Sequence, residues 1–372
     1  MKLNSMFKDR INFQELKLLR EYPLLLKLRL KKIFSKKINN NGGILVINPC
    51  IIGDFTATLP ALRSFIERQG EDVDLVVIPP VKTLAESIRG VKKVYTAKSI
   101  YARNYENEVD YQDISKYYRL VMVFRISTDA YNLLKNIKYS NLISYDVSYL
   151  KYTFHVIKNI ILKKEVKQWN EINFEIVGIN KPVNQITFDD IFNFNEHDYN
   201  RVRELPEMTG TSKKIIIHTG SGWSIKLWSD KKWLELVKKI NELGDYKFIF
   251  IGGSSTEEES FNYLQRNLDF KIYSLIKKVD LRTILLIMRI SNYFIGIDSG
   301  PRNLAHLANL RSISMLGPAP KNFMPFNPDD IVIDKFTCRC KSLFYFHRES
   351  AMQKITVDEV LEGFIKLSNK QN

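Results

Sequence analysis

Three polar turns of this sequence combine residues that could hold a charged ligand or accept a proton. The turn nearest the C-terminus, Asp298-Ser-Gly-Pro301, lies between an apolar run that reads as a buried strand and a run with apolar residues at helical spacing. Gly300 permits a tight turn, Pro301 suits the first helical position, and Asp298 or Ser299 can cap the helix. Backbone N–H groups at such a helix N-terminus can hold a phosphate, although an ordinary capped turn would have the same sequence.

The second turn lies at mid-chain and repeats the order of strand, polar turn and amphipathic helix. It contains Thr219, Gly220 and Ser221, which could offer hydroxyl and backbone donors to phosphate, with a plain turn as the alternative. The third turn, near the start of the chain, follows the apolar strand that ends at Ile47 and carries Asp54. An N-cap for a helix that begins near Phe55 would explain Asp54 without any chemistry.

Together the three turns resemble the family 9 glycosyltransferases, the bacterial heptosyltransferases that build the inner core of lipopolysaccharide. The matching features are Ile-Gly-Asp-x-x-x-x-x-Pro-Ala-Leu-Arg after the first strand, His-x-Gly-Ser-x-x-x-x-Lys-x-Trp at mid-chain and Asp-Ser-Gly-Pro-x-x-x-Ala late in the chain. The resemblance implies an α/β fold of the GT-B type, with two Rossmann-like domains whose parallel sheets face each other across a cleft. In such sheets ligands bind at the carboxyl ends of the strands, where all three turns fall.

The resemblance also implies an inverting transfer of a sugar, with heptose from ADP-heptose as the expected donor and a lipopolysaccharide core or related glycan as acceptor. Asp54 takes the place of the family's general base toward the acceptor hydroxyl. Lys226, in Lys226-Leu-Trp228, takes the place of the family's lysine that contacts donor phosphate. The negative charge of the diphosphate grows as the glycosidic bond breaks, so the site needs cationic or N–H groups around it. Thr219, Gly220 and Ser221 are expected to assist it.

Further donor contacts are implied around the nucleotide. Asp298, Ser299 and Gly300 match residues that close on the nucleotide part, and we expect the Asp298 carboxylate to point away from the diphosphate, toward ribose or a helix cap. The family carries a ribose-binding glutamate near 257–259, for which we name Glu257, although acidic residues are also favoured in the first turn of a helix.

The sequence departs from the family pattern in three places. Asn48-Pro49 stands where a basic residue often follows the first strand, and Asn303 stands where the family has histidine, with His306 one helical turn later. Asn303 keeps a hydrogen-bond donor but carries no charge, which puts the identity of the donor in doubt. The third departure is a long basic extension at residues 1–42.

Composition limits the alternatives. The formal net charge of +15 calls for an acidic partner, and nucleic acid, an anionic membrane or a phosphorylated small molecule would all qualify. We find no helix-turn-helix, zinc-finger spacing or RNP-like aromatic strand, and the positive charge is scattered, so we expect no nucleic-acid partner. A nucleotide-sugar or phosphate-ligand binding module without catalysis is the other alternative, and the presence of both Asp54 and Lys226 argues against it.

The chain is expected to form two domains. Residues 1–42 form a basic amphipathic extension that either lies on an anionic membrane or packs on the body of the protein. We predict an acceptor domain at 43–190, a polar connection, a donor domain at 213–350, and a C-terminal helix at 351–372 that could pack back on the first domain. Strands and helices alternate through both domains, and residues 131–156 are more helical by pattern.

The cysteines and the absence of metal-binding motifs bear on the cell compartment and on cofactors. Cys50, Cys338 and Cys340 are too few for a disulfide framework, which favours a reducing cytoplasm, and we find no signal peptide or membrane-spanning run. If the basic extension binds membrane, the protein is expected on the inner face of the cytoplasmic membrane. Cys338, Cys340 and His347 fall short of a four-ligand zinc site. No Asp-x-Asp pair follows a strand, so we expect no metal and no cofactor.

Overall fold

The computed structural model describes residues 42–97, 114, 117–124, 128–144, 169–179, 186–317, 327–335 and 351–369. The basic extension, except Gly42, lies outside these residues, as do Cys338, Cys340 and His347. Within the described ranges no helix is both long and apolar enough to cross a membrane. The chain divides into two compact units, Met1–Asn193 and Phe194–Asn372, and the division falls inside the polar connection between the two predicted domains.

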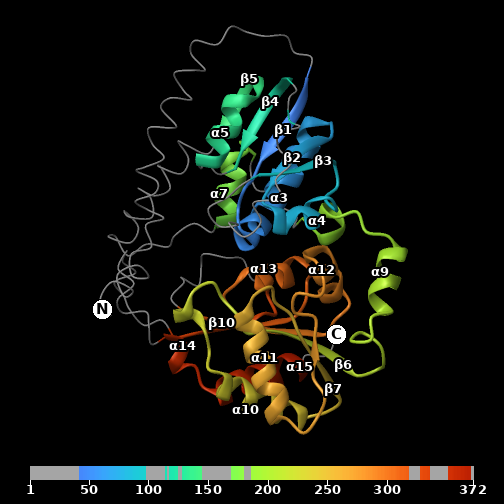
Figure 1. The fold of residues 1–372 in the computed structure, drawn as a ribbon, viewed down its shortest axis with the longest axis vertical. Helices are drawn as coiled ribbons and strands as arrows, with labels where there is room; N and C mark the ends of the chain where they lie inside the picture. The colour runs from blue at the N-terminus through green and yellow to red at the C-terminus, as the bar shows by residue number, and fades with distance from the viewer. Residues whose placement is uncertain are drawn as a thin grey trace. The chain divides into compact units, whose positions relative to one another are not determined.

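The first unit contains a parallel sheet of five strands in the order β3-β2-β1-β4-β5. Its elements are β1 (Gly43–Ile47), α3 (Ile52–Gln69), β2 (Val73–Val77), the 3-10 turn η1 (Pro79–Val81), α4 (Lys82–Ala85), β3 (Val91–Thr96), β4 (Tyr117–Val123), α5 (Thr128–Asn136), β5 (Lys138–Ser144), α7 (Trp169–Ile176) and α8 (Phe188–Ile191) (Figure 1). The central strand β1 is buried at four of its five residues, as expected for a strand covered on both faces. The predicted α/β class is confirmed for this unit.

Two predictions about the first unit are wrong in detail. The segment 131–156 is not helical throughout, because α5 ends at Asn136 and is followed by β5, an edge strand whose polar residues concealed it. Helix α3 starts at Ile52, before the start near Phe55 that the sequence suggested, and it runs on through Pro60. Buried Phe55 and Leu59 keep the first turns of α3 helical, so tertiary packing overrides the local signal of proline.

The second unit contains a parallel sheet of six strands in the order β11-β10-β9-β6-β7-β8. Its elements are α9 (Glu196–Arg203), β6 (Lys213–His218), the 3-10 turn η4 (Ser224–Lys226), α10 (Asp230–Asn241), β7 (Tyr246–Phe250), α11 (Ser255–Asn267), β8 (Tyr273–Ser274), α12 (Leu281–Arg289), β9 (Tyr293–Ile297), α13 (Gly300–Leu307), β10 (Ser312–Leu316), β11 (Ile331–Asp334), α14 (Ala351–Lys354) and α15 (Val357–Asn369). The order of the strands changes direction between the central strands β6 and β9. In such sheets ligands bind outside the carboxyl ends of the strands at this point.

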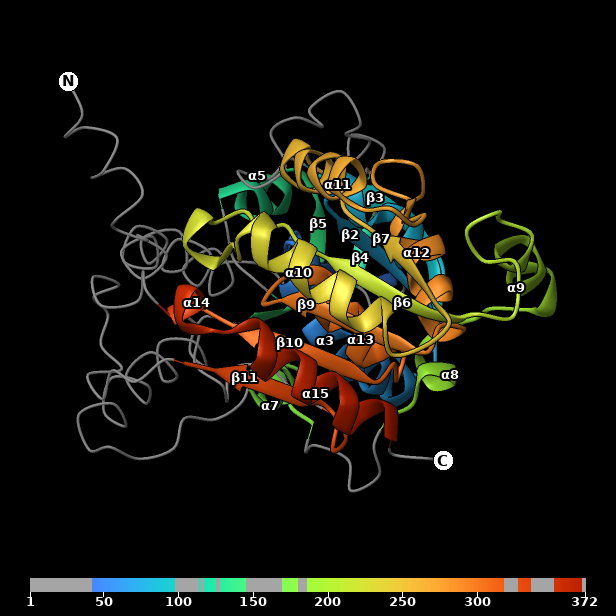
Figure 2. The ribbon, with the colours of Figure 1, turned by 90° about the horizontal axis from the view of Figure 1, so that it is seen from below.

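Helices cover both faces of the second sheet. Helices α10, α11 and α15 share one apolar core with the strands, while α12 and α13 lie on the other side (Figure 2). The buried face of α15, with Val360 and Phe364, packs within this core of the second unit. Packing of the C-terminal segment on the first domain stays a prediction.

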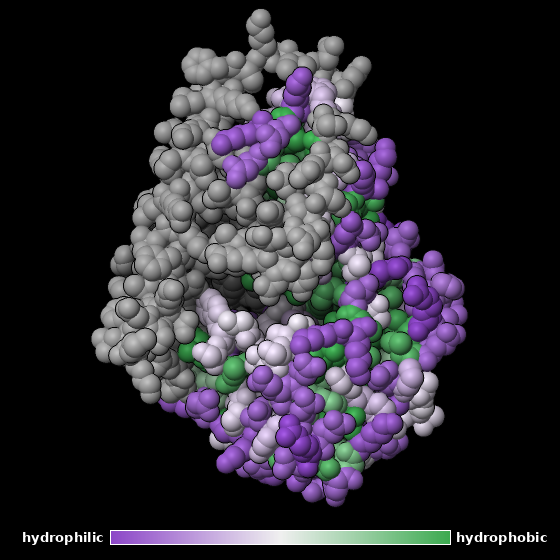
Figure 3. Space-filling model, in the orientation of Figure 1, coloured by the Kyte–Doolittle hydropathy of each residue, from purple (hydrophilic) through white to green (hydrophobic). Residues whose placement is uncertain are grey.

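The surface of the second unit carries no broad apolar patch on the side shown in Figure 3, where hydrophilic residues predominate and hydrophobic ones are scattered. Among the described residues the large hydrophobic side chains that are exposed are Ile51, Trp223, Leu243 and Ile365. Of these, Trp223 lies in the turn after β6, beside the predicted phosphate ligand Lys226.

Candidate functional site

The predicted donor residues of the second unit gather at one edge of its sheet. Strands β6, β7 and β9 are parallel and adjacent, and their carboxyl ends lie together. The predicted residues follow these ends as Thr219, Gly220, Ser221 and Lys226 after β6, Glu257 in the first turn of α11 after β7, and Asp298, Ser299, Gly300 and Asn303 after β9. Residues separated by up to 84 positions in the chain are therefore neighbours in space.

Lys226 and Asp298 form an ion pair in this group. The Lys226 Nζ atom lies 2.6 Å from Asp298 Oδ2 and 3.4 Å from the Asp298 backbone oxygen. The side chains are 17% and 13% exposed, so the pair is largely shielded from water. The ammonium also lies over the Trp223 ring, 4.9 Å from its centroid.

The expected orientation of Asp298 is wrong. We expected its carboxylate to point toward ribose or to cap a helix, but it points at Lys226, and the N-cap of α13 is Ser299, whose side chain forms no capping bond. The physical reason is that a shielded carboxylate beside a shielded ammonium is held most favourably as a pair, since either charge alone would be costly.

His218, the last residue of β6, connects two other turns of the site. Its Nδ1 atom lies 3.0 Å from Ser299 Oγ, and its Nε2 atom lies 3.3 Å from Glu257 Oε1. The His218 ring is 4% exposed. A single buried imidazole thus joins the ends of β6 and β9 to the first turn of α11.

Among the three acidic residues at the start of α11, Glu257 is the one that faces the site. Its Oε2 atom accepts hydrogen bonds from Ser254 N, at 2.9 Å, and from Ser254 Oγ, which completes a capping box. Burial by itself raises the pKa of Glu257, but hydrogen bonds from His218 and Ser254 outweigh it and lower the pKa to about 2. Glu257 is therefore ionised at neutral pH, and capping alone does not account for its contact with His218.

Two glycines enclose the Glu257 carboxylate. A Cβ atom built on Gly220 would overlap Glu257 Oε1, and one built on Gly252 would lie 2.6 Å from Glu257 Cγ. By contrast, Gly222 and Gly253 have open space at the same position. Gly220 and Gly252 are thus needed because the carboxylate occupies the space of their missing side chains.

The tryptophan of the Lys-x-Trp motif has a structural role that the sequence did not reveal. Trp228 is 2% exposed, its Nε1 atom donates to the Ile355 backbone oxygen at 3.1 Å, and its ring meets that of Trp233 edge-on at 5.1 Å. It anchors the turn that carries Lys226 to the core.

Ser221 behaves as the plain-turn alternative predicts, since its Oγ accepts a hydrogen bond from Trp223 N at 3.2 Å. The hydroxyl hydrogen of Ser221 can still be donated to another group.

A buried cation lies behind the turn after β9, and the sequence analysis missed it. Arg302 is 1% exposed and donates from Nη1 to Asn303 Oδ1 at 2.8 Å. Burial lowers the pKa of Arg302 to about 10, and the charges of Asp298 and Asp330 oppose that shift. Burial, with Arg302 nearby, lowers the pKa of His306 to about 4, so His306 is neutral and does not supply the charge that Asn303 lacks.

Asp54 belongs to the first unit and lies at the carboxyl end of its sheet. It is half-buried in the first turn of α3, two residues beyond the first helical residue. The N-cap of α3 is Ile51, so the alternative that Asp54 caps this helix is wrong.

Asn48, which follows β1, is fully buried and donates from Nδ2 to Thr58 Oγ1 at 2.7 Å, so it fixes the strand to the helix.

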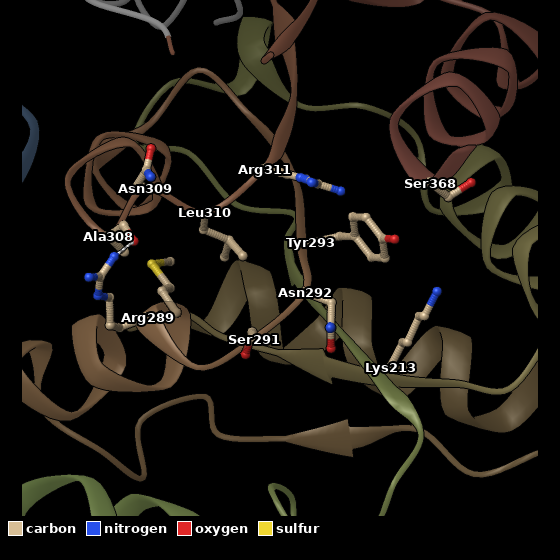
Figure 4. Close-up of a pocket in the computed structure, with 11 residues that line it drawn as sticks. Lys213, Arg289, Ser291, Asn292, Tyr293, Ala308, Asn309, Leu310, Arg311 and Ser368 are labelled. Atoms are coloured by element: carbon tan, nitrogen blue, oxygen red, sulfur yellow. Dashed lines mark hydrogen bonds between the residues drawn. The ribbon is translucent and has the colours of Figure 1, made fainter. Parts of the chain in front are cut away.

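A cavity of about 430 Å³ lies at the opposite, amino-terminal edge of the second sheet (Figure 4). Its lining includes Lys213, Arg289 and Arg311, but α12 and α13 both end there, and Arg289 donates to the Ala308 backbone oxygen at 3.3 Å. Cations at helix C-termini offset the partial negative charge of the terminal carbonyl groups. The fold thus accounts for Arg289, and none of the predicted site residues lines the cavity.

A model of the family described as "Glycosyltransferase family 9 (heptosyltransferase)" matches residues 135–355, more than half of the chain. The chain belongs to glycosyltransferase family 9. A relative of this family 9 protein, lipopolysaccharide heptosyltransferase 1 of Campylobacter coli, is 28% identical over 138 residues, which span 36% of this chain and 40% of that protein. The match therefore covers less than half the length of that relative.

Solved structures share the fold of this family 9 chain. The E. coli ADP-heptose lipopolysaccharide heptosyltransferase II has a TM-score of 0.65 at 16% identity, over 87% of this chain and 98% of that one. A family 9 glycosyltransferase of Veillonella parvula reaches 0.69 at 15% identity, over 91% and 100%. The E. coli heptosyltransferase WaaC, solved with ADP-2-deoxy-2-fluoro heptose, reaches 0.63 at 15% identity, over 87% and 99%. The predicted GT-B class is thus confirmed.

Proposed function

We propose that this family 9 chain is an inverting glycosyltransferase that moves heptose from ADP-heptose to a lipopolysaccharide core or a related glycan. The observation that carries the proposal is the ion pair of Lys226 with Asp298 at the carboxyl-terminal edge of the second sheet. In this proposal the Lys226 ammonium, which is largely shielded from water, faces the diphosphate leaving group at this edge of the sheet. The structure of a relative with an ADP-heptose analogue supports the choice of donor.

The donor would be held by groups of two kinds. Lys226 and the backbone N–H groups at the start of α13, together with Thr219, Gly220 and Ser221, are proposed to face the diphosphate. Glu257 and Ser299, which present oxygen acceptors, are proposed to face the hydroxyl groups of the donor. Because Asp298 already accepts one Lys226 hydrogen, the phosphate oxygens would share the three hydrogens of this ammonium with it.

Asp54 is proposed to act as the general base. Its carboxylate would take the proton of the acceptor hydroxyl, whose oxygen forms a bond to the anomeric carbon while the bond from that carbon to the diphosphate oxygen breaks and ADP leaves. Attack opposite the leaving group inverts the anomeric centre. No metal is needed in this scheme, because Lys226 and helix N-termini offset the charge of the diphosphate.

A panel of ligands tests the choice of donor. A ligand that binds only the folded state raises the melting temperature by an amount set by its affinity. ADP should stabilise the chain more than GDP or UDP, and short RNA should stabilise it least. Stabilisation by RNA alone would favour the nucleic-acid alternative and contradict the proposal.

We propose that residues 1–42 bring the enzyme to an anionic membrane that carries a lipid-linked acceptor. Each basic residue near such a surface contributes roughly 1 kcal/mol, and salt weakens the attraction. The full chain should sediment with vesicles that contain anionic lipid and be released by salt, whereas a chain that starts at residue 43 should not. Equal sedimentation of both chains would assign the extension to packing.

A further inference from the structure

We propose that Trp223 is a specificity-determining residue of the donor site, whose indole ring holds the Lys226 ammonium and lies against the sugar that the donor diphosphate carries. The inference rests on the proposed function, because it adds a residue to the same site. Trp223 lies in the turn between β6 and α10, at a position that the His-x-Gly-Ser-x-x-x-x-Lys-x-Trp motif leaves open.

The exposure of Trp223 distinguishes it from the two tryptophans that follow it. Trp228 and Trp233 are 2% and 0% exposed and meet edge-on in the core, whereas Trp223 is 36% exposed. A large aromatic ring stabilises the fold mainly through the surface that it buries, so packing explains little of this position. A ring exposed beside a predicted phosphate ligand is instead suited to contact with a bound molecule.

Backbone hydrogen bonds fix Trp223 between two predicted phosphate ligands. Its N–H group donates to Ser221 Oγ at 3.2 Å, and its carbonyl oxygen accepts from the Lys226 N–H group at 3.0 Å. Trp223 is also the N-cap residue of the 3-10 turn η4, which ends at Lys226. The indole ring and the Lys226 side chain therefore leave the same ordered turn.

The ring attracts the ammonium electrostatically. Lys226 Nζ lies over the Trp223 ring, 4.9 Å from its centroid, and 2.6 Å from Asp298 Oδ2. The face of an indole ring is negative because of its quadrupole, so it attracts a cation without adding a formal charge. The ring thus holds the ammonium without a carboxylate that would repel a diphosphate, and the hydrogens that Asp298 does not accept can be donated to phosphate oxygens.

The same contact places the ring beside whatever Lys226 binds. A phosphate oxygen that accepts from Lys226 Nζ lies about 3 Å from it, and so at most about 8 Å from the ring centroid, the sum of the two distances. The sugar is joined to the diphosphate directly, whereas adenine is separated from it by the ribose. C–H groups on the face of a sugar pack favourably on the negative face of an aromatic ring. The geometry therefore favours the transferred sugar as the partner of Trp223.

The test compares adenosine, ADP and ADP-heptose as ligands of the full chain, measured by calorimetry. Trp223→Leu keeps an apolar side chain but has no aromatic face, so ADP binding should weaken about two- to fivefold, and adenosine binding should not change. The loss for ADP-heptose should be larger by a further factor of about two or more. Trp223→Phe should keep part of both effects. Leu243→Ala, which changes an exposed leucine, is the control and should leave all three affinities unchanged.

Three results would overturn the proposal. A folded Trp223→Leu protein with wild-type affinity for ADP would show that the ring does not hold Lys226. Equal losses for ADP and ADP-heptose would exclude the contact with the sugar. A loss of the same size for adenosine would assign the ring to the base.

Tryptophan fluorescence provides a readout that a purely structural role would not change. The difference in emission between the wild type and Trp223→Phe isolates the emission of Trp223. Saturating ADP-heptose should protect this emission from quenching by acrylamide, and ADP should protect it less. Equal quenching with and without ADP-heptose would contradict the contact with the sugar.

Quenching without ligand separates this inference from the proposed function. If the Lys226 ammonium covers the ring, Lys226→Ala should make the Trp223 emission more accessible to acrylamide, with the Trp223→Phe form of each protein subtracted. Lys238→Ala, which removes an exposed lysine on α10, should have no such effect. If the wild-type chain binds none of the three ligands, the proposed donor is wrong, and this quenching still decides whether Trp223 holds Lys226. Equal quenching of the wild type and Lys226→Ala would contradict the positioning of Lys226 by the ring.

Discussion

The ammonium of Lys226 lies 2.6 Å from the carboxylate of Asp298, so the cation at the centre of the candidate site is already paired before any ligand arrives. The pair keeps a long, flexible side chain in one place. A diphosphate would bind beside an ordered ammonium, which lowers the conformational entropy lost on binding. It would also bind beside a negative charge, which limits the net attraction.

Lys226→Ala should weaken the binding of ADP far more than that of adenosine, because the partner of Lys226 is phosphate. A charge-assisted hydrogen bond of roughly 1.5–3 kcal/mol is lost. Calorimetry with both ligands measures the difference, and Lys231→Ala, which removes an exposed lysine on α10, is the control. Equal weakening of both ligands would show that Lys226 does not contact phosphate.

Gly220→Ala should lower donor affinity and stability, because the new methyl group would occupy the space of the Glu257 carboxylate. The flexible glutamate would have to move, and with it the contact to His218. Gly222→Ala, two residues along the same turn, meets no atom within 4 Å and should change neither property by much. Melting temperature and ADP affinity of the two variants provide the comparison, and similar losses in both would contradict the packing described here.

The stability contributed by Glu257 should depend on pH. Burial tends to raise the pKa of Glu257, but its hydrogen bonds lower it from the ordinary 4.5 to about 2 in the folded chain. A lowered folded pKa means that the carboxylate stabilises the protein above about pH 4.5, and that this contribution is lost as the pH falls toward 2. The shift corresponds to about 3 kcal/mol.

Denaturant unfolding of the wild type and of Glu257→Gln, at pH 7 and at pH 3, checks this contribution. The difference in the free energy of unfolding between the two proteins should be smaller at pH 3. Glu259→Gln, an exposed neighbour on α11, should show no such change. A difference that is constant with pH would mean that Glu257 is not held as an ionised acceptor.

Much of this arrangement could be predicted from the sequence because strand-turn-helix units leave a local signal. Apolar runs such as β1 and β9, each followed by a glycine-containing turn, indicated parallel strands whose carboxyl ends meet. The residues predicted to bind the donor do lie together at the carboxyl-terminal edge of the second sheet. Strands β3, β5, β10 and β11 were not predicted. Strand β5 is a polar edge strand, and β10 contains two buried serines, Ser312 and Ser314.

What the sequence could not predict are the contacts between turns. Asp298 lies 72 residues from Lys226, and the expectation that it points elsewhere considered the ligand but not this lysine. The buried guanidinium of Arg302 was missed for a related reason, since an arginine after a helix-starting proline reads as a solvated charge. Only the fold reveals which charges are close enough to pair.

Asp54→Asn separates an enzyme from a binding module. Asparagine keeps the size of the side chain but cannot take a proton, so turnover should fall about 10²–10⁴-fold while ADP affinity is unchanged. Because Asp54 lies in the first turn of α3, loss of its charge should cost about 0.3–1 kcal/mol of stability, which the melting temperature reports. Full turnover in the folded variant would contradict the catalytic role.

The most direct measurement of the central claim is sugar transfer by the purified full chain. ADP-heptose and a lipopolysaccharide core that lacks heptose are incubated with it, with EDTA present, and the acceptor mass and the released ADP are measured. We predict that the acceptor gains one heptose for each ADP released and that the new linkage has the anomeric configuration opposite to that of the donor. An acceptor of unchanged mass, in a preparation that binds ADP-heptose, would contradict heptosyl transfer to this acceptor.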